Sequence, residues 1–312
     1  MDSVASSLPK GFSLVGGIPL KSQDFAASII FIVAFGLLIP LAFWRIIHKP
    51  TRSTVLIRPC IVLVVRIATY AIRAVEANGN YAEGLFIAEQ ILLLLGLLPL
   101  CEPLISLLKF HVRRNWIPTP ENVHNKSILS RVLWLLETAL LVGIILGVIA
   151  GSKTSDAMSD PDELSSLKSY RYGITGLTLF VIVASPVVAG FFTFREGLPF
   201  RPLALLVGCA SILLIPSIYK LDITLHPPSS FSAGSKAAFY CLSALPEWIL
   251  VTVYLGVDLE SLFAVHEGQW KERVAKKMRK GKWSGPYVAR DEFEMHQTRA
   301  DGVQRTAWED KV

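Results

Sequence analysis

Long apolar runs alternate with short polar segments along most of the chain. The hydrocarbon core of a bilayer is about 30 Å thick, and roughly 20 apolar helical residues cross it. Runs of this kind occur seven times, and none alternates apolar and polar residues as membrane β-strands do. The pattern predicts an all-α membrane bundle of seven transmembrane helices. They are expected at residues 25–47, 56–75, 82–110, 128–150, 170–194, 202–219 and 237–263.

The first apolar run is too long for a cleaved signal peptide. A signal peptide carries about 7–15 apolar residues behind a basic segment. Here the run has 23 residues, and the charges of residues 1–24 before it cancel. We therefore expect an uncleaved first helix, preceded by a short extracellular or lumenal segment at 1–24.

Lysine and arginine accumulate on alternate connections between the spans. Eighteen of them fall on the side of the C-terminal tail and seven on the opposite side. Because cytoplasmic loops carry the excess of positive charge, the N-terminus is expected outside and the C-terminus in the cytoplasm. A plasma membrane is favoured over an internal one. The sequon at Asn125 then lies on the cytoplasmic side, where it should stay unmodified.

Composition agrees with the membrane prediction and changes how the net charge is interpreted. The chain is 52% hydrophobic and 18% charged, against about 25% charged in a typical soluble domain. A net charge of +6 would suit nucleic-acid binding if it formed a surface patch. Most of the excess instead lies just after the last span, so no nucleic-acid partner is expected.

The segment after the last span has the pattern of a basic amphipathic helix. Trp270, Val274 and Met278 recur at helical spacing among lysines and arginines. Such helices lie on the anionic cytoplasmic leaflet, although a solvated stalk is an alternative. We assign this juxtamembrane helix to 264–283 and expect 284–312 to be disordered. Its lipid contacts would be made by Lys271, Arg273, Lys276, Lys277, Arg279 and Lys280.

No residue pattern supports catalysis, a metal or a cofactor. All four cysteines fall within predicted spans, where they are expected to act as small apolar residues. The six histidines fall in loops, at span ends or in the tail. The sequence contains no HExxH, GxSxG or P-loop motif. We therefore expect a protein that is not an enzyme.

Charged residues inside the spans are the candidate site. Such groups are costly in a membrane and usually face the bundle interior. Arg66, Tyr70 and Arg73 lie on one helical stripe, while Glu89 and Glu247 lie at similar depths on other spans. These five residues could line a polar cavity in the outer half of the bundle and bind a ligand there. The alternative is structural, with arginine–glutamate pairs such as Arg66–Glu89 and Arg58–Glu102 joining helices.

The fourth span carries Gly143, Gly147 and Gly151 at four-residue intervals. A stripe of small residues lets two helices approach closely. We expect it to serve packing within the chain, with homodimerisation as the alternative.

Two short stretches resemble fungal seven-helix membrane proteins. The first is RIATYAIR at 66–73 followed by YAEGLFIAEQILLL at 81–94, and the second is LPEW at 245–248. In length and layout, the chain is similar to the fungal lipid-translocating exporters linked to aminocholesterol resistance. It is also similar to uncharacterised receptor-like fungal families. The resemblance implies a fungal source and a seven-helix fold.

Three functions remain open from the sequence. The first is a receptor or sensor with an outer cavity and a basic cytoplasmic surface. The second is an exporter of lipids or small amphiphiles, and the third is an intramembrane enzyme. The odd number of spans and the absence of a visible internal repeat disfavour a conventional transporter, so a receptor-like sensor is preferred. A polar path through the whole bundle would instead favour transport.

Overall fold

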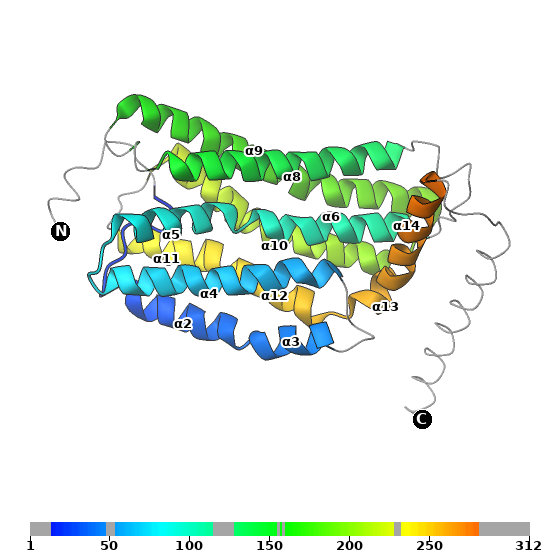
Figure 1. Cartoon of the computed structure of the whole chain (residues 1–312), viewed down its shortest axis with the longest axis horizontal. Helices are drawn as coiled ribbons and strands as arrows, with labels where there is room; N and C mark the ends of the chain where they lie inside the picture. Colours follow the sequence, from blue (N-terminus) through cyan, green and yellow to red (C-terminus); the bar gives the residue numbers. More distant parts are fainter. Residues whose placement is uncertain are drawn as a thin grey trace.

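In the computed structural model, the chain forms one bundle of helices that lie side by side (Figure 1). The structure describes residues 14–47, 54–114, 128–154, 157, 160–227 and 232–280, and these contain no strand. Asn125, Lys282 and the tail at 284–312 lie outside the described residues. The expectations about the sequon and the tail therefore stay predictions.

The helices run back and forth between two ends of the bundle, which we name the α2 end and the α14 end (Figure 1). The helices are α2 (Phe25–Gly36), α3 (Ile39–Ile47), α4 (Ile57–Ala77), α5 (Glu83–Leu95), α6 (Leu98–Val112), α8 (Ile128–Ser152), α9 (Pro161–Glu196), α10 (Phe200–Leu225), α11 (Ala233–Phe239), α12 (Leu245–Gly256), α13 (Leu259–Phe263) and α14 (Val265–Arg279), with a 3-10 turn at Thr54–Leu56.

Among the described residues, six helical segments are long and apolar enough to cross a membrane, which identifies a multi-pass membrane protein. They are Phe25–Ile47, Gly84–Val112, Leu129–Ser152, Asp162–Glu196, Phe200–Leu225 and Ala233–Gly256. Each overlaps one of the seven expected spans. The remaining expected span corresponds to α4, which has 21 residues and lies alongside the others. Its composition differs because Arg58, Arg66, Arg73 and Glu76 all lie within it.

Several expected boundaries were wrong. The outer connection expected at 151–169 is partly helical, because α9 already begins at Pro161. Asp160 caps that helix, its side chain accepting a hydrogen bond of 2.9 Å from the Asp162 amide. The sixth span extends to Leu225 rather than 219. The seventh ends at Gly256, and 259–263 forms the separate helix α13.

Three of the membrane helices are interrupted. One is broken between α2 and α3, and another is broken at Gly96, between α5 and α6. Between α11 and α12, residues Tyr240–Ala244 form a wide π turn directly before Pro246. Proline lacks the N–H that would bond to the preceding turn, and π turns often occur at functional positions. These breaks place irregular backbone beside the buried charges described below.

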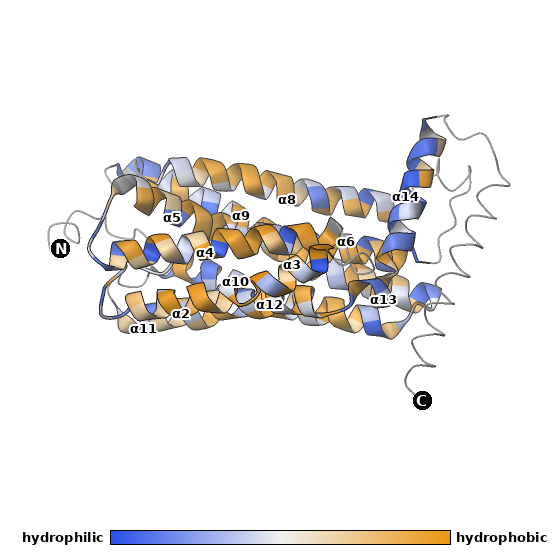
Figure 2. Cartoon of the chain, turned by 60° about the horizontal axis from the view of Figure 1, so that its bottom comes forward, coloured by the Kyte–Doolittle hydropathy of each residue, from blue (hydrophilic) through white to orange (hydrophobic). Residues whose placement is uncertain are grey.

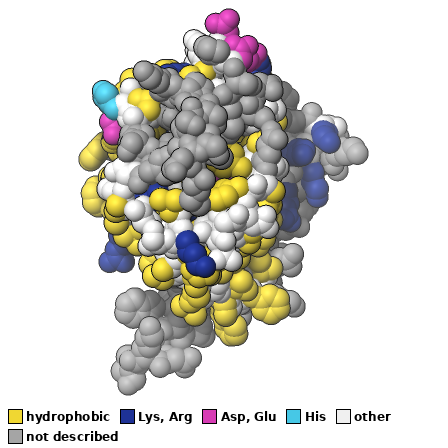
Figure 3. Space-filling model, turned by 90° about the vertical axis from the view of Figure 1, so that its left-hand side faces the viewer, with side chains coloured by type: hydrophobic (Ala, Val, Ile, Leu, Met, Phe, Trp, Pro, Cys, Tyr) yellow, Lys and Arg dark blue, Asp and Glu magenta, His cyan; other side chains and the backbone are white. Residues whose placement is uncertain are grey.

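The bundle is apolar on its outside and carries charges on its inside. Large hydrophobic side chains such as Leu37, Trp134, Val187 and Phe194 are exposed on its flanks. Figure 2 shows apolar residues along the length of the helices, and Figure 3 shows apolar side chains around the circumference at the α2 end. Arg66, by contrast, is buried. This distribution is expected where lipid surrounds the protein.

The glycine stripe of α8 packs against helices of the same chain. A Cβ atom added at Gly147 would lie 2.2 Å from Leu95, and one at Gly151 would lie 2.3 Å from Ile91. At Gly143 the nearest atom, in Leu98, is 3.2 Å away. The three glycines therefore let α8 approach α5 and α6 closely. A homodimer through these glycines stays a prediction.

The tail helix α14 lies across the end of the bundle (Figures 1 and 2). Its Val274 is buried, and Glu272 pairs with Lys109 and, at 3.3 Å, with Arg113. Lys271 was expected at the lipid surface, but it is buried and its Nζ donates to the Arg114 carbonyl at 2.8 Å. The apolar side of α14 and Lys271 are thus used for docking onto the bundle.

Candidate functional site

Arg73 is the centre of a buried ionic network at the α2 end. Its Nη1 lies 2.6 Å from Glu89 Oε1 on α5, and its Nη2 lies 2.8 Å from Asp24 Oδ1. Nη2 also donates to the Gly16 carbonyl, and Nε donates to the Tyr240 hydroxyl at 3.1 Å. One guanidinium thus joins α4 to α5, to the π turn and to the segment before α2. Each of its three nitrogens donates to at least one of these partners, as the planar fork of a guanidinium allows.

Asp24 receives a second cation from α11. Lys236 is buried, pairs with Asp24 Oδ2, and also donates to the Ile18 carbonyl at 2.7 Å. Burial alone raises the pKa of the Asp24 carboxyl, but the charge of Arg73 and the hydrogen bond from Lys236 outweigh it. The pKa of Asp24 is therefore lower than its ordinary value. The segment that was assigned to an outside N-terminus at 1–24 thus contributes a charge to the interior.

Aromatic rings enclose this network. The Arg73 guanidinium lies 4.9 Å from the centre of the Phe239 ring, a favourable cation–π distance. Tyr70, one turn deeper on α4, stacks with Phe31 at 5.3 Å and Phe35 at 6.0 Å between ring centres. The rings exclude solvent from the charges, which strengthens the ionic contacts.

A second ion pair lies deeper in the bundle, between Arg66 and Glu247. Both side chains are 1% exposed. Arg66 Nη1 also donates to the Leu92 carbonyl at 3.3 Å, at the break between α5 and α6. Glu247 Oε1 lies 3.4 Å from the Ser243 hydroxyl in the π turn. Each partner thus contacts an irregular stretch of backbone.

Glu76 is buried beside the Arg73 network without a hydrogen-bond donor. Its side chain is 0% exposed, and neither carboxyl oxygen receives a hydrogen bond from the described residues. The Glu89 carboxyl lies within hydrogen-bonding reach of it. The spacing of three residues on one helix would allow Glu76 to pair with Arg73. Arg73 instead uses its donors on Asp24 and Glu89.

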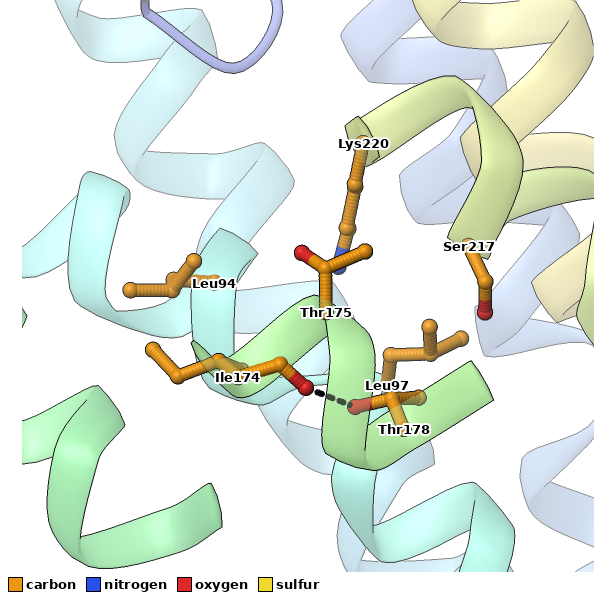
Figure 4. A pocket seen from close by; sticks show the side chains of 7 residues that line it. All are labelled: Leu94, Leu97, Ile174, Thr175, Thr178, Ser217 and Lys220. Atoms are coloured by element: carbon orange, nitrogen blue, oxygen red, sulfur yellow. Dashed lines mark hydrogen bonds between the residues drawn. The ribbon is translucent and has the colours of Figure 1, made fainter. Parts of the chain in front are cut away.

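A small cavity lies between α5, α9 and α10, beside the deeper ion pair (Figure 4). Its volume is about 10 Å³, enough for about one water molecule. Lys220 projects toward it and donates to the Leu93 carbonyl at 2.8 Å. The lining residues are Leu94, Leu97, Ile174, Thr175, Thr178, Ser217 and Lys220. None of the five expected site residues lines this cavity.

Beyond the deeper ion pair, toward the α14 end, the interior is apolar. After Gly96, the buried side chains of α6 are mainly leucines, and Tyr254 and Leu255 of α12 face the same region. His111, farther along α6, is bonded to Thr193 at 2.8 Å. The network described above is therefore separated from the α14 end by a packed apolar layer. The fully buried members are Leu100, Leu104, Leu107, Leu108, Leu136, Leu206, Leu250, Val251, Tyr254 and Leu255.

The structure brings the expected site residues together but changes their pairing. All five are buried, and their ligand-binding role stays a prediction. The expected pair Arg66–Glu89 was wrong, because Arg66 faces Glu247 and Arg73 takes Glu89. The expected pair Arg58–Glu102 is confirmed. Depth along the helix had suggested both pairs, but it does not give the direction in which a side chain points.

Sequence reasoning missed three members of the network: Asp24, Lys236 and Tyr240. Asp24 and Lys236 lie at the starts of helices, where charged residues are usually attributed to a loop. A carboxylate directly before the first span was the available signal. Glu137, within the fourth span, is exposed on the bundle surface and belongs to no such network.

The cysteines differ in how far they are buried. Cys101 and Cys209 are buried as expected, but Cys241 is exposed on the bundle surface. Within the described residues, no group of His, Cys, Asp and Glu side chains could hold a metal ion.

Comparison with known proteins gives one match. Residues 21–262 match a family described as a domain of unknown function, DUF7702. No curated protein and no solved structure matched the chain. The matched region begins before Asp24 and ends within α13, so it contains the ion pairs of Arg66 and Arg73 and the helices from α2 to α12. The chain belongs to the DUF7702 family.

Proposed function

We propose that this protein is a seven-helix sensor of the receptor type, with α4 as the seventh membrane crossing. Its N-terminus faces the outside, its C-terminus faces the cytoplasm, and its membrane is the plasma membrane. The excess of Lys and Arg at the α14 end supports this orientation. The burial of Arg66, Arg73 and Glu76 supports the seventh crossing, because these charges face the bundle interior and not lipid.

One observation carries the proposal: the ion pairs of Arg66, Arg73 and Lys236, in which both partners are almost fully buried, lie in the half of the bundle near the α2 end. They connect α2, α4, α5, α11 and α12, and the leucine-rich layer closes them off from the α14 end. A sensor needs a polar site that opens to one side and a packed region that transmits its state. A transporter needs a polar route to both sides.

Lipid or amphiphile export is the second candidate, and the interrupted helices favour it. Many transporters form their substrate site from broken membrane helices near the membrane centre. The breaks at Gly96 and in the π turn lie beside Arg66 and Glu247. The resemblance to fungal lipid-translocating exporters points in the same direction. The apolar layer argues against this function.

The cytoplasmic partner of the sensor would meet the α14 end. Arg273, Lys276 and Lys280 are exposed there, and they form a basic surface suited to the anionic leaflet or to an acidic protein. Lys277 and Arg279 complete the expected lipid-facing set. Lys271 belongs to the docking contacts of α14.

Hydrogen exchange in lipid nanodiscs tests whether the network communicates with the α14 end. We expect Glu247→Gln, which breaks the deeper ion pair, to accelerate amide exchange in α13 and α14. Glu102→Gln removes a partly exposed ion pair and serves as the control. Changes confined to α4, α11 and α12 would contradict the sensor proposal, because the pair would then serve local structure alone.

Lipid flux separates the two candidates. Proteoliposomes containing the wild-type chain and a fluorescent phospholipid should show no more flux than protein-free liposomes. Flux above that level, lost in both Arg66→Ala and Glu89→Ala, would favour the exporter and overturn the sensor. If flux occurred but neither substitution changed it, the buried charges would have no role in transport.

A further inference from the structure

Glu76 is a buried carboxyl group whose surroundings supply no hydrogen bond. It is the penultimate residue of α4, it has no exposed surface, and both oxygens lack a donor among the described residues. A carboxylate placed in this way loses its hydration without compensation. Removing the charge by binding a proton is the usual solution.

The donors around Glu76 are already used by other groups. Arg73, on the same helix, serves Asp24, Glu89, Gly16 and Tyr240. Lys236 of α11 serves Asp24 and Ile18. The Tyr81 hydroxyl, in the turn between α4 and α5, donates to the Pro19 carbonyl at 2.5 Å. The Tyr240 hydroxyl lies 3.1 Å from Asp24 Oδ1 and 3.2 Å from the Ser28 hydroxyl.

The charges of the network do not balance without a proton. Asp24, Glu76 and Glu89 supply three carboxyl groups, while Arg73 and Lys236 supply two cations. If all five were ionised, the cluster would hold one uncompensated negative charge in an apolar surrounding. Asp24 contacts both cations and Glu89 contacts one, so Glu76 is the member left over.

We propose that Glu76 and Glu89 form a proton-binding site, in which the two carboxyl groups share one proton. The proton resides on Glu76 and is donated to Glu89 Oε2, because Arg73 already occupies Oε1. Gln90 Nε2, at 3.5 Å from the same Oε2, supports the arrangement from the neighbouring position on α5. Without the proton, Glu76 is a hydrogen-bond acceptor that no donor reaches. With the proton, its hydroxyl becomes a donor, and the Glu89 carboxylate accepts its hydrogen bond. The site does not depend on the sensor function, although it supplies such a sensor with a ligand.

Infrared spectroscopy of the wild-type chain in lipid bilayers tests the site directly. A protonated carboxylic acid has a C=O stretching band that a carboxylate lacks. At neutral pH we expect this band, with the frequency shift that follows exchange into D₂O, and we expect it to disappear as the pH is raised. Its absence at neutral pH would overturn the proposal, whatever the variants show.

Two variants assign the band and test the charge argument. Glu76→Gln removes the protonated group and replaces it with an isosteric donor to Glu89, so the band should be lost while the protein stays folded. Glu89→Gln leaves two carboxylates facing two cations, so Glu76 should ionise and the band should again be lost. Glu102→Gln, outside the network, should leave the band unchanged.

The remaining outcomes contradict the site. A band that persists in Glu76→Gln belongs to another carboxyl group, and one that persists in Glu89→Gln shows that charge balance does not govern Glu76. Thermal unfolding confirms that each variant is folded before its spectrum is compared. The wild-type spectrum alone can contradict the proposal, so the test still holds if one of the variants is unstable. The lipid-flux and hydrogen-exchange results do not bear on this band.

Discussion

At the residue scale, Arg66 depends on the missing side chain of Gly96. A Cβ atom at residue 96 would lie 2.4 to 2.8 Å from three atoms of the Arg66 guanidinium. The guanidinium cannot easily withdraw, because it is 1% exposed and held by Glu247 and the Leu92 carbonyl. The glycine is therefore required by the close approach of a charge, and not by its own backbone angles.

We predict that Gly96→Ala lowers the stability of the folded protein by about 1–3 kcal/mol, a typical penalty for overpacking a core. Thermal unfolding in detergent measures the effect. The matched control is Gly208→Ala in α10, where nothing lies within 4 Å of the added Cβ. Alanine there should raise stability by up to about 1 kcal/mol, as in a helix interior. Equal stability of the two variants would contradict the contact.

The sequence could predict some of the residues that belong to the site, but it could not predict how they pair. Arginines and glutamates in apolar spans stand out at once, and all five expected residues are buried. Their partners depend on how each helix is rotated about its axis, which helical rise does not give. That is why Arg66 was paired with Glu89 on depth alone. Asp24 and Lys236 were missed because the chain folds them inward from helix starts.

At the element scale, α14 is held by its apolar side and by ion pairs. Val274 is buried against the bundle, while Lys276, two residues later, is exposed. Helix α14 is thus amphipathic, as its sequence predicts, but part of its apolar side faces the bundle and not lipid. A helix docked in this way can leave the bundle without unfolding the rest.

We predict that Val274→Ser accelerates hydrogen exchange of the α14 amides and leaves α4 to α12 unchanged. The physical reason is that the substitution removes apolar contact and buries a hydroxyl group in its place. Exchange followed by mass spectrometry in nanodiscs gives the measurement. Lys276→Ser, on the exposed side, should leave exchange at the wild-type rate. If both variants exchanged alike, Val274 would not be a docking contact.

Elements were predicted with uneven success, for identifiable reasons. Hydropathy located the spans, because lipid imposes the same length on each. It could not locate the breaks at Gly96 and at Tyr240–Ala244, which lie inside uninterrupted apolar runs. It also began α9 too late and ended α10 too early, since the polar end of each continues as helix beyond the apolar stretch.

At the scale of the whole molecule, α4 decides the topology. The other six segments satisfy the requirements of a membrane span by length and composition. With six crossings, both termini would lie on one side of the membrane, and with seven they lie on opposite sides. The charges of α4 do not exclude a crossing, because Arg66, Arg73 and Glu76 are covered by neighbouring helices and do not face lipid.

Cysteine labelling distinguishes the two topologies. In a background with the four native cysteines replaced, single cysteines are placed at exposed positions: Lys21 before α2, Asn78 after α4 and Ser261 in α13. Seven crossings with the N-terminus outside predict that Lys21→Cys and Asn78→Cys react with a membrane-impermeant maleimide on intact cells. Ser261→Cys should react only after permeabilisation.

Each alternative gives a different labelling pattern. If α4 did not cross, Asn78→Cys would be protected on intact cells while Lys21→Cys and Ser261→Cys both reacted. Arg73 would then lie on the opposite side of the membrane from Asp24, and their ion pair could not form. If the orientation were inverted, Ser261→Cys alone would react before permeabilisation. Only labelling of both Lys21→Cys and Asn78→Cys places Asp24, Arg73 and Glu89 together at the outer end, where protons from the medium could reach Glu76.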